Sequence, residues 1–219
     1  MRRFSAVLFD LDGTLLDTLA DIASSMNFTL QQHGLQPYTL QEYPFLVGSG
    51  LREMVLAALH GQGRADDLAD EIVEGFRAEY DRRWAENSRS YDGMVEALQR
   101  LHEAGVRLAV LSNKPDSFTQ VMVRRLLPAE LFDAVLGHRE PFPIKPAPDS
   151  TLHILRQLGV SPERAALVGD SDVDILTARN AGIVPIGVDW GFRPREELIE
   201  AGARYMASSP SALASWLLG

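Results

Sequence analysis

Short apolar runs recur along the chain, and each is followed by a glycine, a serine or an acidic residue. They cover residues 6–9, 106–111, 134–136, 165–168 and 183–188. Because apolar and polar residues do not alternate within them, the runs are typical of strands buried on both faces of a sheet. Helical patterns lie between the later runs, over residues 94–104, 150–158 and 172–181, and a glycine suited to a C-terminal cap follows each of them.

The alternation of strands and helices predicts an α/β fold, with a Rossmann-like parallel sheet and helices on both of its faces. In such sheets, ligands bind at the carboxyl ends of the strands. Asp10, Ser112 and Asp170 each come directly after a predicted strand or within two residues of its end. We therefore expect these three side chains to meet at one edge of the sheet.

Residues 17–91 break the alternation, because they carry helical patterns and no strand-like run. One pattern runs from Leu19 to Leu30 and stops at Gly34. In another, residues 68, 72, 76, 80 and 84 lie four apart, and we interpret this largely aromatic stripe as core packing rather than a ligand site. The pattern predicts a helical insert between the first strand and the rest of the sheet.

The chain is acidic and contains no cysteine. Its formal charge of −9 over 219 residues disfavours a nucleic-acid binder, which would usually show a basic face, and means that local positive charge must capture any anionic substrate. The lack of cysteine excludes disulfides, thiolate metal sites and a cysteine nucleophile. No apolar run is long enough for a membrane span, and the first is too short for a secretion signal. A cytoplasmic enzyme that binds neither nucleic acid nor membrane is expected.

Two acidic clusters follow predicted strands. Asp10 and Asp12 lie two residues apart in the segment Asp-Leu-Asp-Gly-Thr (residues 10–14), where buried carboxylates are unfavourable unless a cation compensates them. Asp170 and Asp174 lie one helical turn apart, so both could face one point. Turn formation and helix capping are the alternative roles, but capping does not account for Asp170. Hard oxygen ligands without a nearby histidine favour Mg²⁺.

The chain has two lysines against nineteen arginines, and Lys145 lies between the two acidic clusters in sequence. An ammonium is a compact charge that fits between a carboxylate and a phosphate oxygen, whereas a guanidinium is a wide planar fork. Ser112 and Asn113 offer a hydroxyl and an amide at a strand end, although an ordinary turn would use the same residues. The run Gly48-Ser49-Gly50 beside Arg52 lies in the insert, where a loop could reach down over the site.

In this order, residues 10–14, Ser112-Asn113, Lys145-Pro146 and residues 169–174 resemble the four motifs of the haloacid dehalogenase-like superfamily. The match covers nearly the whole chain. The helical insert resembles the cap of the phosphoglycolate phosphatase-like branch, and residues 188–193 (Val-Asp-Trp-Gly-Phe-Arg) resemble that branch more loosely. The resemblance implies a catalytic core of residues 1–16 and 92–219 and an all-helical cap domain of residues 17–91.

The resemblance also implies a role for each motif. Asp10 would attack phosphorus and become an aspartyl phosphate, and Asp12 would act as general acid and then as general base. Mg²⁺ would be held by Asp10, the Asp12 backbone carbonyl and Asp170, with support from Asp174. Lys145, Ser112 and Asn113 would bind the phosphoryl group, and Arg52 is predicted to influence substrate choice from the cap.

Dehalogenases of the superfamily lack the second aspartate, and phosphonoacetaldehyde hydrolases need a cap lysine, which this insert does not contain. Hydrolysis of a small phosphorylated metabolite, with phosphoglycolate first among the candidates, is therefore expected from a monomer or homodimer. A phosphomutase of the β-phosphoglucomutase type shares all four motifs and stays open as an alternative. An inactive metal-binding scaffold is the alternative from another class.

Overall fold

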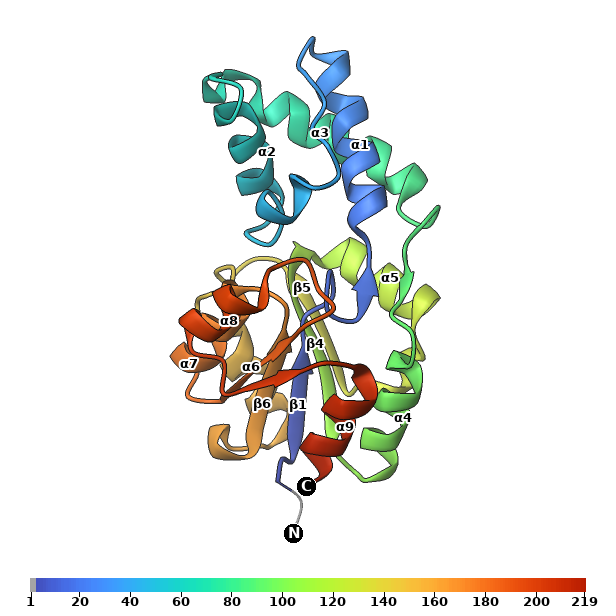
Figure 1. Cartoon of the computed structure of the whole chain (residues 1–219), viewed down its shortest axis with the longest axis vertical. Helices are drawn as coiled ribbons and strands as arrows, with labels where there is room; N and C mark the ends of the chain where they lie inside the picture. Colours follow the sequence, from blue (N-terminus) through green and yellow to red (C-terminus); the bar gives the residue numbers. More distant parts are fainter. Residues whose placement is uncertain (1–2) are drawn as a thin grey trace.

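The computed structural model describes residues 3–219. Within them, six parallel strands form one sheet in the order β5-β4-β1-β6-β7-β8, and β1 lies between β4 and β6 (Figure 1). The strands are β1 (Ala6–Phe9), β4 (Arg107–Pro115), β5 (Ala134–His138), β6 (Ala165–Gly169), β7 (Val184–Val188) and β8 (Tyr205–Ala207). The predicted parallel sheet is confirmed. The sequence analysis missed β8, because three residues are too few for a recognisable apolar run.

Helices cover both faces of the sheet. Val7 and Phe9 of β1 belong to a cluster that includes residues of α4 and α9, whereas Ala6 and Leu8 belong to a second cluster with residues of α6 and α7. This division follows from the strand period of two, which sends alternate side chains to opposite faces. The helices of this part are α4 (Met94–Glu103), α5 (Asp116–Leu126), α6 (Asp149–Leu158), α7 (Asp172–Asn180), α8 (Arg195–Ala201) and α9 (Pro210–Leu218), with 3₁₀ turns η3 (Ala129–Leu131) and η4 (Pro162–Arg164).

Residues 17–91 form the helical layer above the carboxyl ends of the strands (Figure 1). It contains α1 (Leu19–Gln32), η1 (Tyr43–Phe45), α2 (Leu51–His60), η2 (Asp66–Leu68) and α3 (Ala69–Arg83). The expectation of no strand in this region was wrong at its end. There β3 (Arg89–Ser90) pairs antiparallel with β2 (Leu16–Asp17), at the point where the chain leaves and re-enters the core. A two-residue strand has no sequence pattern of its own and forms only through its partner.

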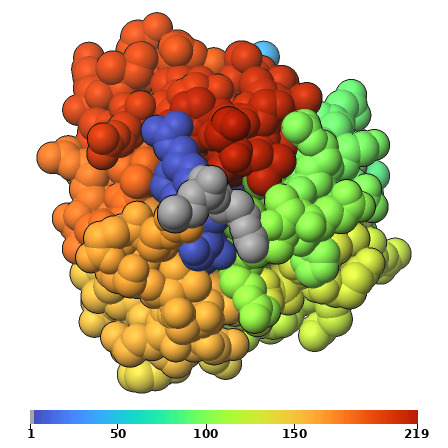
Figure 2. Space-filling view, turned by 90° about the horizontal axis from the view of Figure 1, so that it is seen from below, coloured from blue at the N-terminus to red at the C-terminus, as the bar shows by residue number. Residues whose placement is uncertain are grey.

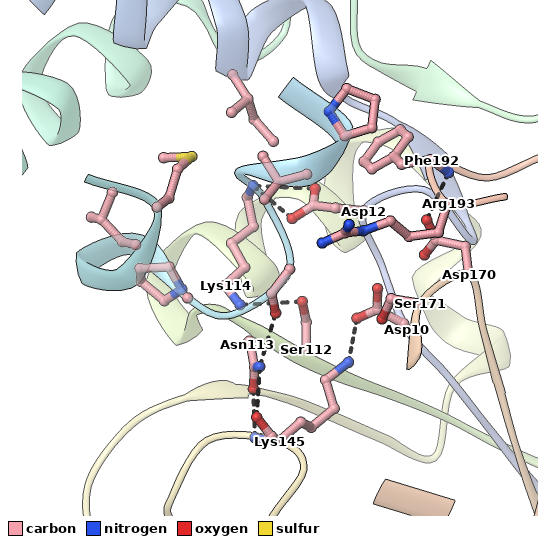
Figure 3. Close-up of a pocket in the computed structure, with 18 of the residues that line it drawn as sticks. Asp10, Asp12, Ser112, Asn113, Lys114, Lys145, Asp170, Ser171, Phe192 and Arg193 are labelled. Atoms are coloured by element: carbon pink, nitrogen blue, oxygen red, sulfur yellow. Dashed lines mark hydrogen bonds and ion pairs between the residues drawn. The ribbon is translucent and has the colours of Figure 1, made fainter. Parts of the chain in front are cut away.

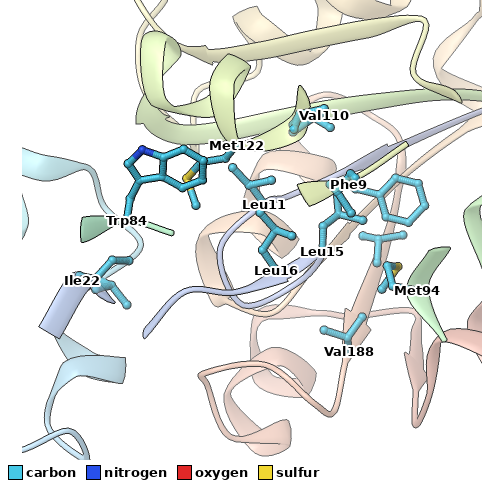
Figure 4. Packing of buried hydrophobic residues seen from close by; sticks show 14 of the residues in the cluster. Phe9, Leu11, Leu15, Leu16, Ile22, Trp84, Met94, Val110, Met122 and Val188 are labelled. Atoms are coloured by element: carbon cyan, nitrogen blue, oxygen red, sulfur yellow. The ribbon is translucent and has the colours of Figure 1, made fainter. Parts of the chain in front are cut away.

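The helical layer shares one apolar cluster with the sheet. Ile72, Phe76, Tyr80 and Trp84 of the predicted stripe are buried in it, as core packing requires. In Figure 4, Leu11, Leu15 and Leu16 lie between Phe9 on the sheet and Ile22 and Trp84 of the insert. The turn after β1 therefore packs against both parts.

Asp21 anchors the returning chain to α1. Its buried carboxylate accepts hydrogen bonds from the Asn87 backbone N–H and side-chain amide, and from the Ser88 N–H and hydroxyl, at 2.8–3.1 Å. Burial alone would raise the pKa of Asp21, but these hydrogen bonds outweigh burial and lower it below the ordinary 3.8. The ionised carboxylate therefore stabilises the fold at pH values above 3.8. This contribution is lost as the pH falls through the lower pKa of the folded state.

Replacing Asp21 with asparagine is expected to lower the free energy of unfolding by about 2 kcal/mol at neutral pH, because a charged acceptor of several hydrogen bonds is lost. Urea denaturation from pH 7 to pH 3 measures the effect. The difference between wild type and variant should begin to shrink as the pH falls below the ordinary pKa of 3.8, where the unfolded wild-type chain takes up a proton. A difference that stays constant with pH would contradict the proposed charge dependence, and the exposed Asp67→Asn serves as the control.

The opposite end of the sheet is closed by the chain start. The Ser5 N–H donates to the Arg164 carbonyl at 2.7 Å, and the Arg107 N–H donates to the Ser5 carbonyl at 2.9 Å. Figure 2 shows the first described residues between the C-terminal segment (red) and the segment near residue 160 (orange). None of the helices within residues 3–219 has the length and apolarity needed to cross a lipid bilayer.

Candidate active site

A cavity lies between the carboxyl ends of the strands and the helical layer, with about 700 Å³ of empty space when the part open to solvent is included (Figure 3). Asp10 follows β1, Asp170 follows β6, and Lys145 lies in the loop between β5 and α6. All three line the cavity together with Asp12 and Ser112. The structure thus brings the predicted side chains to one edge of the sheet, as the strand ends indicated.

Three buried carboxylates gather at the base of the cavity. Oxygen atoms of Asp10, Asp170 and Asp174 lie within 4.8 Å of one another. Burial raises the pKa of Asp10 to about 7 against the opposing charge of Lys145, and burial likewise raises the pKa of Asp170. One ammonium cannot balance three carboxylates, so a divalent cation would stabilise the cluster. An all-oxygen donor set suits a hard cation such as Mg²⁺.

The backbone around Asp170 leaves no room for other side chains. A Cβ on Gly13, which has φ of 84°, would lie 2.1 Å from Asp170 Oδ2, and a Cβ on Gly191 would lie 2.1 Å from Asp170 Cβ. Thr14 Oγ1 donates to Asp170 Oδ1 at 3.0 Å, and the Phe192 N–H donates to Oδ2 at 2.8 Å. These contacts fix the carboxylate. The sequence analysis did not predict the contact between Thr14 and Asp170, because the two residues lie 156 positions apart.

Lys145 joins two of the carboxylates. Its Nζ donates to Asp10 Oδ1 and Asp174 Oδ1 at 2.7 Å each, and to the Leu111 carbonyl at 3.2 Å. Burial disfavours the charged form, but the two carboxylates raise the pKa of Lys145, so it remains an ammonium at neutral pH. Asp174 also accepts hydrogen bonds from the Ser171 N–H and hydroxyl, at 3.2 and 2.7 Å. Both of its oxygens are therefore engaged within the protein.

Asn113 holds the loops around the site. Its Nδ2 donates to the Gly48 carbonyl at 3.0 Å and to the Lys145 carbonyl at 3.1 Å, and its Oδ1 accepts from the Lys145 N–H at 2.7 Å. The Gly48 contact shows that the glycine loop of the insert does reach the site. Because the Asn113 amide is engaged with backbone groups, its binding of a phosphoryl oxygen stays a prediction. Ser112 Oγ accepts from the Lys114 N–H at 3.2 Å and faces the cavity.

Lys114 is the other of the two lysines, and the sequence analysis did not predict its contact with Asp12. Its Nζ lies 3.0 and 3.2 Å from the two carboxylate oxygens of Asp12, and it stands over the Tyr80 ring at 4.6 Å from the centroid. Thr18 Oγ1 also donates to Asp12 at 2.7 Å. The scarcity of lysine was the sequence signal that could have identified Lys114. Both lysines of the chain pair with aspartates of the first acidic cluster.

The family model of the haloacid dehalogenase-like hydrolases matches residues 7–188, which include all four motifs and the helical insert. The chain belongs to this family.

Several relatives of this hydrolase are phosphatases. It is 37% identical over 188 residues to a phosphoglycolate phosphatase from Agrobacterium fabrum, covering 84% of this chain and 80% of that enzyme. It is 34% identical over 212 residues to an N-acetylmuramic acid 6-phosphate phosphatase from Pseudomonas aeruginosa, covering 96% and 93%. A crystal structure from Lactobacillus delbrueckii, assigned as a phosphoglycolate phosphatase, matches with a TM-score of 0.93 at 31% identity over 100% of both chains. The hydrolase is thus a phosphoric monoester hydrolase, similar to phosphoglycolate phosphatases.

The structure places Arg52 of the hydrolase away from the cavity. Its side chain is exposed and pairs with Asp70, while Leu51 and Met54 of the same helix line the cavity. The predicted influence of Arg52 on substrate choice therefore lacks a contact through which it could act. Arg193, in the loop after β7, lines the cavity instead. The sequence analysis noted its segment but assigned it no function.

Proposed function

We propose that this hydrolase transfers the phosphoryl group of a small phosphate monoester to Asp10 and then to water. The observation that supports this most strongly is the position of Asp10, which is buried beside an ammonium at 2.7 Å and two further carboxylates. A carboxylate and a phosphate dianion repel each other unless fixed positive charge offsets them. Lys145 supplies part of this charge.

The proposed reaction has two steps. Asp10 attacks phosphorus through a carboxylate oxygen, the bond from phosphorus to the leaving oxygen breaks, and Asp12 gives that oxygen a proton. In the second step, Asp12 takes a proton from water as the water oxygen attacks phosphorus, the bond from phosphorus to the Asp10 oxygen breaks, and inorganic phosphate leaves with the Asp10 carboxylate regenerated. Lys114 and Thr18 position Asp12 at the cavity wall, because both donate hydrogen bonds to its carboxylate.

The residues that would hold Mg²⁺ are Asp10, the Asp12 backbone carbonyl and Asp170, with Asp174 in support. The bound ion would supply positive charge that offsets the phosphoryl oxygens and the carboxylates around them. Asp174 fits a supporting position, since its oxygens already accept hydrogen bonds from Lys145 and Ser171.

Replacing Asp170 with asparagine is expected to weaken Mg²⁺ binding at least about tenfold and to slow phosphate release, because a charged ligand becomes neutral. Isothermal titration with Mg²⁺ measures the binding directly. The matched control is Asp172→Asn, because the Asp172 carboxylate accepts from the Val173 N–H outside the cluster. Unchanged Mg²⁺ affinity in Asp170→Asn would remove Asp170 from the metal site.

Residues 17–91 would act as a cap domain on a core of residues 1–16 and 92–219. Ile22, Met54 and Phe76 of the insert line the cavity, and the Gly48 carbonyl accepts a hydrogen bond from Asn113 of the core. Such a cap would exclude water during the first step.

Phosphoglycolate is the first substrate candidate, because several similar proteins are phosphoglycolate phosphatases. N-acetylmuramic acid 6-phosphate is a second, on the basis of the relative that aligns over 96% of this chain. A phosphate-release screen with Mg²⁺ over small phosphate esters tests the proposal. Interconversion of sugar phosphates without phosphate release would indicate a mutase, and no turnover of any ester would indicate an inactive scaffold.

A further inference from the structure

The cavity has a charged floor and an apolar roof. The roof comes from the helical insert, which contributes the side chains of Ile22, Val47, Leu51, Met54 and Phe76. The charged side chains that line the cavity within residues 3–219 all belong to the core. A charged leaving group would therefore lose its hydration against the roof without gaining a partner there, which is unfavourable.

Arg193 is the cation of the cavity with the most freedom to bind a ligand. Lys145 and Lys114 are already hydrogen-bonded to aspartates at 2.7 to 3.2 Å. Among the described residues, Arg193 has one carboxylate neighbour within 4 Å, Glu197, at 3.7 Å, which is beyond hydrogen-bond distance. Its side chain is 17% exposed, and its guanidinium lies 5.3 Å from the centroid of the Phe45 ring of the insert.

The fold fixes the loop that carries Arg193. Trp190 Nε1 donates to the Thr14 carbonyl at 3.0 Å, and the Phe192 N–H donates to Asp170 at 2.8 Å. Between them, Gly191 packs so closely on Asp170 that a side chain there would overlap the carboxylate. The loop is thus bound to the turn after β1 and to the acidic cluster, so the starting point of the Arg193 side chain is set by the catalytic floor.

The direction of Arg193 separates it from the phosphoryl end of the site. In Figure 3 the Arg193 side chain points into the cavity toward Asp12, whereas Lys145 and Asn113 lie on the opposite side of the cavity. Asp12 is the proposed proton donor to the leaving oxygen, so Arg193 stands at the leaving-group end.

We propose that Arg193 binds a carboxylate on the leaving group, so that the preferred substrates are phosphate monoesters of hydroxy acids. This inference rests on the proposed phosphatase function. A guanidinium presents paired donors that match the two oxygens of a carboxylate. The roof is apolar, so the Arg193 guanidinium selects between leaving groups. A neutral leaving group would leave the guanidinium unpaired, and a carboxylate would be buried without a partner if the guanidinium were absent.

The test compares phosphoglycolate with 2-hydroxyethyl phosphate, in which a neutral hydroxymethyl group replaces the carboxylate. Arg193→Met removes the charge and keeps an apolar stem, and Arg193→Lys keeps the charge without the fork. Arg195→Met is the matched control, because Arg195 is two residues away and pairs with Asp189. We expect Arg193→Met to lower kcat/KM for phosphoglycolate about 10- to 100-fold, mainly through KM, with less than about threefold change for 2-hydroxyethyl phosphate. Arg193→Lys should restore part of the loss.

Binding provides a second readout that needs no turnover. Calorimetry with Mg²⁺ present measures the affinity of both esters for the Asp10→Asn protein, with and without Arg193→Met. A loss of affinity confined to phosphoglycolate supports the inference even if the wild-type protein does not hydrolyse the ester. In that case only the proposed function fails. Equal losses for both esters would overturn the inference and assign Arg193 to the phosphoryl group. No loss for either ester, or a loss in Arg195→Met of the same size, would also overturn it.

Discussion

Replacing Asp10 with asparagine is expected to reduce phosphate release at least about 10⁴-fold, because the amide cannot form the aspartyl phosphate. The stability of the fold should not fall with the activity. Asp10 lies buried beside Asp170 and Asp174, and its removal as a charge relieves repulsion within the cluster, while Lys145 keeps its contact with Asp174. The expected result is therefore an inactive protein whose melting temperature without metal equals or exceeds that of the wild type.

Single-turnover phosphate release and thermal unfolding measure these two quantities. Asp67→Asn, an exposed site in η2, makes the same chemical change and should leave both unchanged. Turnover within about tenfold of wild type in Asp10→Asn would show that another group attacks phosphorus.

Replacing Lys145 with methionine should affect both stability and activity. The methionine fills part of the space but leaves three buried carboxylates without their ammonium, which typically destabilises a protein by about 3–5 kcal/mol. Phosphate release should fall at least about 100-fold, because the positive charge next to Asp10 is lost. Added Mg²⁺ should raise the free energy of unfolding more in the variant than in the wild type, since the ion would replace part of the missing charge.

A double variant separates charge from packing. If repulsion among the carboxylates causes the loss, Asp174→Asn in the Lys145→Met background removes one of the repelling charges. The double variant should then lose less free energy of unfolding than the two single variants lose in total. Urea denaturation of the two single variants and the double variant measures this coupling. Strictly additive losses would contradict the electrostatic origin and indicate packing instead.

Strand and helix positions were largely predictable because they depend on local periodicity. The helix observed as Asp149–Leu158 was predicted over 150–158, since its apolar spacing and Gly159, which has φ of 66°, are both visible in the sequence. The strands β3 and β8 were missed because each is short and exists only through its partner. A local sequence pattern therefore does not predict a strand that is defined only by its pairing with another strand.

The site was predictable to the extent that it lies at strand ends. Asp10 and Asp170 follow the neighbouring parallel strands β1 and β6, and Ser112 lies near the carboxyl end of β4, so their proximity follows from the order of elements. The contacts of Thr14 and Asn113 were not predictable, because each joins segments that only the folded chain brings together.

The sequence by itself determined the α/β class, the place of the helical insert and the residues that arrive at the carboxyl edge, because apolar period and strand ends are local properties. Only the tertiary structure decided which arginine faces the cavity. Arg52 and Arg193 are both arginines in segments that reach the site, but the packing of α2 turns Arg52 outward to Asp70, and contacts at Asp170 bring Arg193 inward. The direction of a long side chain depends on neighbours distant in sequence, and no local pattern encodes it.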